Sequence, residues 1–247
     1  MTKSALPAKH KFNLLVLNQV PIFTQLQIEE ALLRTDNGNW CILNSGVSPA
    51  IVMGISGVQE KLIDLSQLLN KPVPVIRRFS GGGTVFVDKN TVFATWICNV
   101  NDLNVACYPQ QVHAWMVNFY QKSFPMLNMS LRENDYVIGE RKWGGNAQYL
   151  SKGRWLHHTS MLWDYDPQNM RYLLMPAKRP IYREDRSHEE FLCCLQEYFP
   201  ERHQILTQII GQMQTEFDVK IFSMDDVQEV LERPHRKATV ILNKKDC

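Results

Sequence analysis

The chain has 247 residues, of which 45% are hydrophobic and 21% are charged, a balance typical of a globular protein with a substantial core. Its formal net charge of +2 at pH 7 is too small to indicate a nucleic-acid partner or a membrane surface. No apolar run reaches the roughly 20 residues of a membrane-spanning helix, and the basic start of the chain lacks the apolar core of a signal peptide. Six cysteines without Cys-x-x-Cys spacing are interpreted as reduced thiols, so we expect a cytoplasmic protein.

The predicted elements follow one another irregularly along the chain. Apolar residues in short runs or in alternation predict strands at 13–17, 40–43, 51–53, 73–78, 84–87, 91–98, 135–138, 155–163 and 219–222. Apolar residues at helical spacing predict helices at 22–33, 59–69, 108–124, 189–199, 202–217 and 225–231. This interleaving predicts an α+β fold with a mixed, mainly antiparallel sheet and packed helices. Because no repeat or linker is visible, residues 1–247 are interpreted as a single domain.

The most unusual segment is Arg77-Arg78-Phe79-Ser80-Gly81-Gly82-Gly83-Thr84-Val85, which lies between two predicted strands. Three consecutive glycines lose much backbone entropy on folding unless the chain must approach another group closely. Backbone amides without side-chain bulk can line an anion site, and arginine binds phosphate or carboxylate through two hydrogen bonds. The segment therefore predicts an anion-binding loop, and a glycine-rich turn with two solvated arginines is the alternative.

A second cluster, Arg141-Lys142-Trp143-Gly144-Gly145-Asn146-Ala147-Gln148, places a lysine just before a Gly-Gly-Asn sequence. By itself this pattern predicts a hairpin with an exposed lysine. The adjacent histidines His157 and His158 follow on a predicted strand, where neighbouring side chains face opposite sides. At most one of the two histidines can therefore face a given pocket.

In this order, the Arg-Arg-x-Ser-Gly-Gly-Gly loop, the loop of the Lys-x-Gly-x-Ala type and the His-His-x-[Ser/Thr] strand resemble the lipoate–protein ligase A family, part of the biotin/lipoate ligase and octanoyltransferase superfamily. The resemblance implies a catalytic domain like those of class II aminoacyl-tRNA synthetases and biotin ligases. It also implies activation of lipoate or octanoate by ATP and Mg²⁺ to acyl-AMP, and transfer of the acyl group to one lysine of a carrier. The implied carriers are the lipoyl domains of 2-oxoacid dehydrogenases and the glycine-cleavage H protein.

The resemblance also assigns roles to individual residues. Lys142 is the implied catalytic residue, between the lipoate carboxylate and the α-phosphate, where a compact positive charge offsets the repulsion of two anions. The implied nucleotide-site and pocket residues are Arg77, Ser80, Gly81, Gly82, Gly83, Thr84, Val85, Asp88, Gly145, Asn146, Ala147 and His158. Asp88 is also the candidate for orienting Mg²⁺, although an aspartate that caps a turn is an equal alternative. Val52, Gly54 and Trp96 are candidates for the apolar tunnel of the lipoyl tail.

Several departures from the family pattern leave the activity open. Val87 stands where the family often has histidine, and Thr159 stands where glycine is common. Few residues follow Phe217, so a separate accessory protein could complete the enzyme, the chain could act without one, or it could perform only the transfer half-reaction.

Other activities remain as alternatives. A transferase that uses a cysteine and no ATP is disfavoured because no cysteine stands where branches of the superfamily carry the nucleophile. A non-catalytic protein that binds lipoyl domains is a further alternative. The absence of a Gly-Arg-Gly-Arg loop disfavours a biotin ligase.

Overall fold

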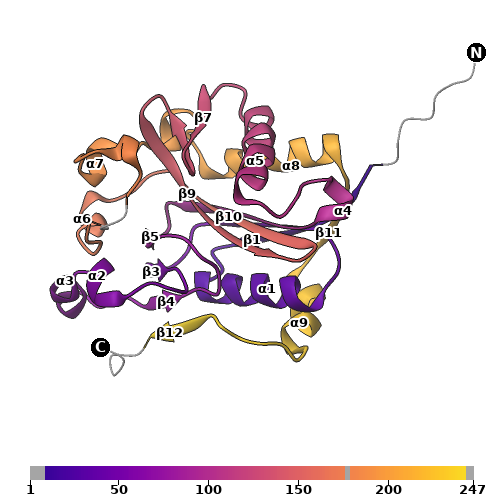
Figure 1. Ribbon diagram of the computed structural model, residues 1–247, viewed down its shortest axis with the longest axis horizontal. Helices are drawn as coiled ribbons and strands as arrows, with labels where there is room; N and C mark the ends of the chain where they lie inside the picture. The colour runs from indigo at the N-terminus through magenta and orange to yellow at the C-terminus, as the bar shows by residue number, and fades with distance from the viewer. Residues whose placement is uncertain (1–8, 176–178, 243–247) are drawn as a thin grey trace, which may run out of the picture.

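The computed structural model describes residues 9–175 and 179–242, and within them two β-sheets carry the fold (Figure 1). The larger sheet has the strand order β11-β1-β2-β6-β10-β9-β8-β7, and the smaller sheet has the order β12-β4-β3-β5. The strands of the larger sheet are β1 (Lys11–Asn18), β2 (Trp40–Ser45), β6 (Thr91–Asn99), β7 (Met129–Arg132), β8 (Asp135–Ile138), β9 (Arg141–Ser151), β10 (Arg154–Leu162) and β11 (Asp218–Phe222). Those of the smaller sheet are β3 (Ala50–Met53), β4 (Val75–Arg77), β5 (Val85–Val87) and β12 (Val240–Leu242).

Helices cover both faces of the larger sheet, with α5 and α8 on one side and α1 and α9 on the other (Figure 1). The helices are α1 (Ile22–Thr35), α2 (Gln59–Leu62), α3 (Leu65–Asn70), α4 (Val100–Leu103), α5 (Pro109–Ser123), α6 (Pro167–Met170), α7 (His188–Phe191), α8 (Arg202–Glu216) and α9 (Met224–Glu232), with 3₁₀ turns η1 (Ile181–Arg183) and η2 (Leu195–Glu197). None of the helices in the described part of the chain is long and apolar enough to cross a membrane.

The pairing of the strands confirms the predicted α+β fold with a mixed, mainly antiparallel sheet. Strand β1 runs parallel to β2 and β11, and β3 runs parallel to β4. The other pairings between these strands are antiparallel. Consecutive strands β7, β8, β9 and β10 are joined as antiparallel hairpins, whereas β6 pairs with β2 and β10, which are distant from it in the chain.

Two local predictions were wrong. The Gly-Gly-Asn run is not a turn, because residues 144–146 continue β9 and pair with residues 159–161 of β10. The helix predicted at 189–199 ends after α7, because Leu192 is extended and forms a bridge with Lys142. The backbone N–H of Cys193 also donates to the carbonyl of Lys142 at 2.9 Å. Pairing with a neighbouring strand therefore overrides local preference at both places.

The side chains of β6 alternate between the two faces of the sheet. Trp96 is fully buried on the face of α5 and α8, with its ring centroid 4.6 Å from that of Phe119. Thr95 faces the other way and reaches α1, where its hydroxyl donates to Glu29 at 2.7 Å. The candidate role of Trp96 in a ligand tunnel is therefore wrong, because Trp96 belongs to the core.

The last described segment joins the smaller sheet through a buried carboxylate. Strand β12 pairs antiparallel with β4, in the register Val240 to Arg77. Just before it, the backbone N–H groups of Ala238 and Thr239 donate to the carboxylate of Glu30, which is 2% exposed and also pairs with Arg34 at 2.9 Å. Glu30 of α1 thus fixes a segment more than 200 positions away in the chain.

Candidate active site

The glycine loop between β4 and β5 is held in shape by a buried arginine. Arg78 is 4% exposed, and its guanidinium donates to the carbonyls of Gly81 and Gly83, each at 2.9 Å, and to that of Val52 at 3.4 Å. Burial lowers the pKa of Arg78 to about 10. Gly54 allows the loop to approach, because a Cβ there would lie only 2.3 Å from the carbonyl oxygen of Gly82.

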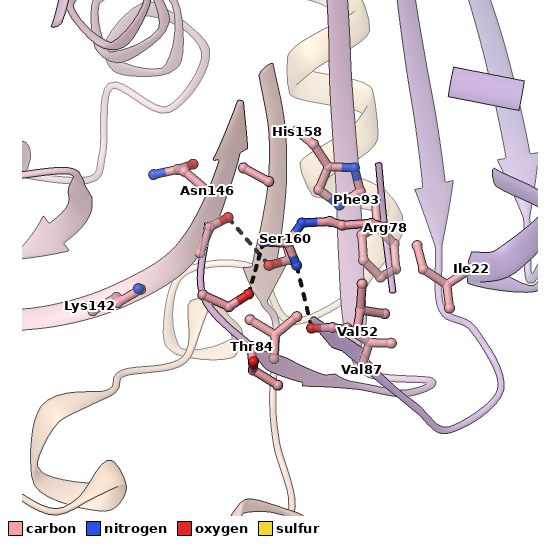
Figure 2. Close-up of a pocket in the computed structure, with 14 residues that line it drawn as sticks. Ile22, Val52, Arg78, Thr84, Val87, Phe93, Lys142, Asn146, His158 and Ser160 are labelled. Carbon is pink, nitrogen blue, oxygen red and sulfur yellow. Dashed lines mark hydrogen bonds between the residues drawn. The ribbon is translucent and has the colours of Figure 1, made fainter. Parts of the chain in front are cut away.

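A first cavity of about 90 Å³ lies beside this loop, and Figure 2 shows side chains that line it. Its apolar wall comes from α1, β3, β5 and β6, and its polar wall comes from the glycine loop, β9 and β10. The lining residues are Ile22, Val52, Arg78, Gly83, Thr84, Val85, Val87, Phe93, Lys142, Gly145, Asn146, Ala147, His158 and Ser160. The structure thus brings the glycine loop, the lysine strand and the histidine strand to one place.

Lys142 is oriented by a carboxylate and a tyrosine. Its Nζ lies 2.6 Å from Oδ1 of Asp135, which is on the neighbouring strand β8 and is 6% exposed. The other oxygen, Oδ2, accepts a hydrogen bond from the Tyr182 hydroxyl at 2.9 Å. Burial, together with the charge of Asp135, raises the pKa of Tyr182, so the phenol keeps its proton and remains a donor.

A second cavity, of about 110 Å³, also includes Lys142 in its lining. It is lined by Thr84, Val85, Phe86, Thr91, Lys142, Gly145, Ser160, Leu162, Met170, Leu173, Arg183, His188, Phe191 and Leu192. Five of these residues also line the first cavity, namely Thr84, Val85, Lys142, Gly145 and Ser160. Lys142 therefore stands at the junction of two cavities.

The two adjacent histidines of β10 have different surroundings. Nδ1 of His158 lies 2.9 Å from Oε1 of Glu29 and 2.9 Å from the hydroxyl of Thr95, so the ring is fixed on the cavity side. His157 faces α5 and is fully buried, which lowers its pKa well below the ordinary value. As predicted from strand geometry, only one of the two faces the cavity.

The structure gathers most of the predicted site residues, but in two different roles. Lys142, Gly83, Thr84, Val85, Gly145, Asn146, Ala147 and His158 line the first cavity, as does the tunnel candidate Val52. Ser80, Gly81 and Gly82 shape the loop: the carbonyl of Ser80 accepts from Ile55, the N–H of Gly81 donates to Gln148, and Gly82 has φ +108°. Gly54 serves the same purpose, by leaving room for Gly82.

Arg77 requires a correction, because the structure places it away from both cavities. It lines a separate surface depression with residues 57–60 and β12. Neighbouring residues of an extended chain face opposite sides, so the arginine that reaches the glycine loop is Arg78.

Asp88 also requires a correction. Its Oδ1 accepts the N–H of Asn90 at 2.8 Å, its Oδ2 accepts from the side chain of Asn169 at 3.2 Å, and it lines a different depression with Asp164 and Asp166. It therefore caps a turn, as the structural alternative predicted. In the part of the chain that the structure describes, no group of three His, Cys, Asp or Glu residues could hold a metal ion. The donor set at Asp88 does not fit Mg²⁺, and we derive no step through that ion.

Sequence reasoning missed Glu29, Asp135, Tyr182 and Arg183. Glu29 had a visible signal, because a carboxylate at position 29 interrupts the apolar stripe of a helix that buries Leu26 and Leu33. The pair Asn134-Asp135 resembles the ligases in sequence, but the contact of Asp135 with Tyr182 had no signal, since it joins residues 47 positions apart in the chain.

Comparison with known proteins places this architecture among lipoate–protein ligases. Residues 21–218 match the family model described as the lipoyl protein ligase A/B catalytic domain, and the chain belongs to this family. The fold resembles the crystal structure of lipoate–protein ligase A bound with ATP, with a TM-score of 0.72 and 16% identity over 91% of this chain and 95% of that one. It also resembles the bi-partite lipoate protein ligase of Thermoplasma acidophilum, reported with its E2 lipoyl domain, with a TM-score of 0.73 and 18% identity over 90% of this chain and 91% of that one.

One curated relative is named as inactive. The chain is 27% identical over 231 residues to inactive lipoate–protein ligase 2 of Plasmodium falciparum, in an alignment that covers 69% of this chain and 60% of the relative. The chain therefore spans about 60% of that relative's length. The family is established by these matches, and the catalytic status of this chain is a separate question.

Proposed function

We propose that the chain is an ATP-dependent lipoate–protein ligase. The carboxylate of lipoate or octanoate attacks the α-phosphorus of ATP, the bond from that phosphorus to the pyrophosphate oxygen breaks, and acyl-AMP and pyrophosphate form. The ε-amine of a carrier lysine then attacks the acyl carbon, AMP leaves, and the amine nitrogen loses a proton. The position of Lys142 at the junction of two cavities carries this proposal.

The two cavities suit the two substrates. The first cavity offers an apolar wall of Ile22, Val52 and Phe93 for the acyl tail. The second offers Phe86, Leu162 and Met170 for the base of the nucleotide. With the substrates placed in this way, the carboxylate and the α-phosphate meet at the lysine ammonium.

Lys142 would then act by offsetting charge. Attack of a carboxylate on a phosphate brings two anions together, and a fixed ammonium in a partly buried site stabilises the charge on the bridging oxygens. Asp135 and Tyr182 hold Lys142 in place before the substrates enter. Because the carrier lysine is the nucleophile, the enzyme needs no covalent residue, and its task is to align the reactants and exclude water from a labile anhydride.

The thiols do not support a transferase that works through a cysteine. Burial raises the pKa of Cys41, Cys98, Cys107, Cys193 and Cys194, the last to about 11. At neutral pH these five are therefore thiols and poor nucleophiles. None of the five lines either cavity, and Cys247 lies outside the described residues.

The name of the Plasmodium relative favours a second candidate, in which this chain binds lipoyl domains or performs only the transfer step. Under either candidate, the partner is a carrier such as a lipoyl domain of a 2-oxoacid dehydrogenase or the glycine-cleavage H protein. The Thermoplasma ligase is bi-partite, which favours an accessory chain as a further partner. Mg²⁺ would enter with the phosphates of ATP, since it is commonly held through substrate phosphates and few carboxylates.

The test incubates the purified chain with lipoate, Mg·ATP and an apo lipoyl domain, and weighs the carrier by mass spectrometry. A parallel reaction supplies preformed lipoyl-AMP. We expect modification in both reactions, with Lys142→Ala reducing acyl-AMP formation at least about 100-fold. The control is Arg141→Ala, which removes an exposed cation from the neighbouring position of β9 and leaves activity unchanged.

Each other outcome changes the conclusion. Modification from lipoyl-AMP alone assigns the transfer step and removes the activation step. No modification in either reaction identifies a binding protein. Near-normal activity of the folded Lys142→Ala variant removes the proposed mechanism.

A further inference from the structure

Arg183 carries a buried charge without a carboxylate partner. It is 6% exposed, and no ion pair joins it to any residue between 9–175 and 179–242. Its Nε donates to the carbonyl of Arg186 at 3.3 Å, its guanidinium lies 4.7 Å from the ring centroid of Phe191, and within the same residues its Nη2 is buried without a hydrogen-bond partner. Burying a cation in this state costs free energy unless an anion pairs with it.

The surroundings of Arg183 indicate which kind of anion. Arg183 lines the second cavity together with Lys142 and His188, and the other side chains there are mostly apolar. Burial lowers the pKa of His188, and the charges of Arg183 and Lys142 lower it further, so these groups lie close together. The hydroxyl of Thr84 lines the same cavity and is buried with no hydrogen-bond partner in the described part of the chain.

Within residues 9–175 and 179–242, Asp135 pairs with Lys142, and no carboxylate forms an ion pair with Arg183. Asp135 contributes to the field at Arg183, but its two oxygens are already taken by Lys142 and by the Tyr182 hydroxyl. The cavity therefore keeps an excess of positive charge beside an apolar wall. That combination complements a phosphate group attached to an aromatic base.

The segment that presents Arg183 is fixed on both sides. The N–H of Tyr182 donates to Glu133 at 3.1 Å, and the guanidinium of Arg186 donates to the carbonyl of Glu140 at 2.8 Å. The N–H of Arg186 closes a turn onto the carbonyl of Arg183 at 3.3 Å. Within that turn Glu184 has φ +54° and ψ −136°, a strained conformation for a residue other than glycine, which persists only where the surroundings impose it.

We propose that Arg183 binds a phosphate of the nucleotide in the second cavity and there adds a second positive charge to that of Lys142. This inference rests on the proposed function, since it places the nucleotide in that cavity. It assigns the guanidinium a contact with phosphate oxygens and assigns the acyl carboxylate to the side of Lys142 that faces the first cavity. The other anion of suitable chemistry, the carboxylate of the acyl substrate, is an outcome that the test separates.

The experiment measures the affinity of the full chain for ATP, AMP, adenosine and octanoate by calorimetry. We expect Arg183→Gln to weaken ATP and AMP about 10- to 100-fold, the loss typical of one hydrogen bond to a charged group. Adenosine and octanoate should bind within twofold of wild type, and Arg183→Lys should recover part of the loss. The control Arg179→Gln removes an exposed cation of the same segment, which pairs with exposed Asp185, and should change none of the affinities more than twofold.

Three results would overturn the assignment. Unchanged ATP affinity in a folded Arg183→Gln variant removes it directly, and an equal loss for adenosine shows that Arg183 only maintains the shape of the cavity. A loss confined to octanoate moves the acyl carboxylate to Arg183. If Arg183→Gln does not fold, Arg183→Met is measured instead, and unchanged ATP affinity in that variant has the same refuting force. The proposed function fails separately, when wild type binds ATP but forms no acyl-AMP.

Discussion

Replacing Gly54 with alanine tests whether the glycine loop must approach β3 closely. The added Cβ would lie 2.3 Å from the carbonyl oxygen of Gly82, a backbone atom that no side-chain rotation can move. The loop must therefore shift by about 1 Å to reach an ordinary van der Waals contact. Overpacking of this kind costs about 1–3 kcal/mol of the free energy of unfolding. A displacement of about 1 Å at a site that aligns reactants costs roughly 100-fold in rate.

The assay pairs urea unfolding with the rate of pyrophosphate release from ATP in the presence of lipoate. Gly211→Ala is the matched control, because it adds the same methyl group in α8 where no atom lies within 4 Å. Alanine is the better helix former, so this variant should gain up to about 1 kcal/mol and keep its activity. The reasoning is refuted if Gly54→Ala matches wild type in both measurements. If it loses stability but keeps its rate, the loop contact is structural and lies outside the site.

Two further predictions concern stability. Burial lowers the pKa of His113, His157 and His188, so below about pH 6.5 the unfolded chain binds more protons than the folded chain. The free energy of unfolding therefore falls as the pH is lowered, by up to about 1.4 kcal/mol per pH unit for each histidine. His113→Leu should flatten this slope between pH 6.5 and 5, as measured by urea unfolding, and an unchanged slope contradicts the prediction. Glu30→Gln should lower the free energy of unfolding by about 1–3 kcal/mol and speed hydrogen exchange of residues 238–242. The control Glu216→Gln, at a more exposed ion pair, should lower it by less than about 1 kcal/mol. Equal effects of the two substitutions would contradict the role of Glu30 in anchoring this segment.

The sequence predicted those features that depend on local pattern. The period of apolar residues gave the class of fold, and the helix predicted at 108–124 matches α5 within a residue or so at each end. The glycine loop and Lys142 line one cavity, together with residues of β5, β9 and β10, although β5 belongs to the smaller sheet and β9 and β10 to the larger one. Short motifs thus predicted which segments line the first cavity.

The failures arose where a long-range contact decides the outcome. The sequence assigned Arg77 to the site, whereas Arg78 contacts the glycine loop, because a shift of one residue at the end of a strand reverses every side chain. Gly144 and Gly145 have turn-forming character, yet pairing with β10 makes them part of β9. Arg183 follows a proline in a segment without periodicity, and only the folded chain brings it beside Lys142.

The alternation of side chains along β10 links the candidate site to the core of the protein. His158 is turned toward the cleft by the same alternation that turns His157 into the apolar interior. If β10 shifted by one position against β6 and β9, His157, which is uncharged and buried, would face the first cavity. His158, which is hydrogen-bonded to Glu29, would then lie in the core among the tryptophans. An insertion or deletion within β10 would therefore disturb the cavity and the core together, whereas a side-chain substitution at position 158 changes only the cavity wall.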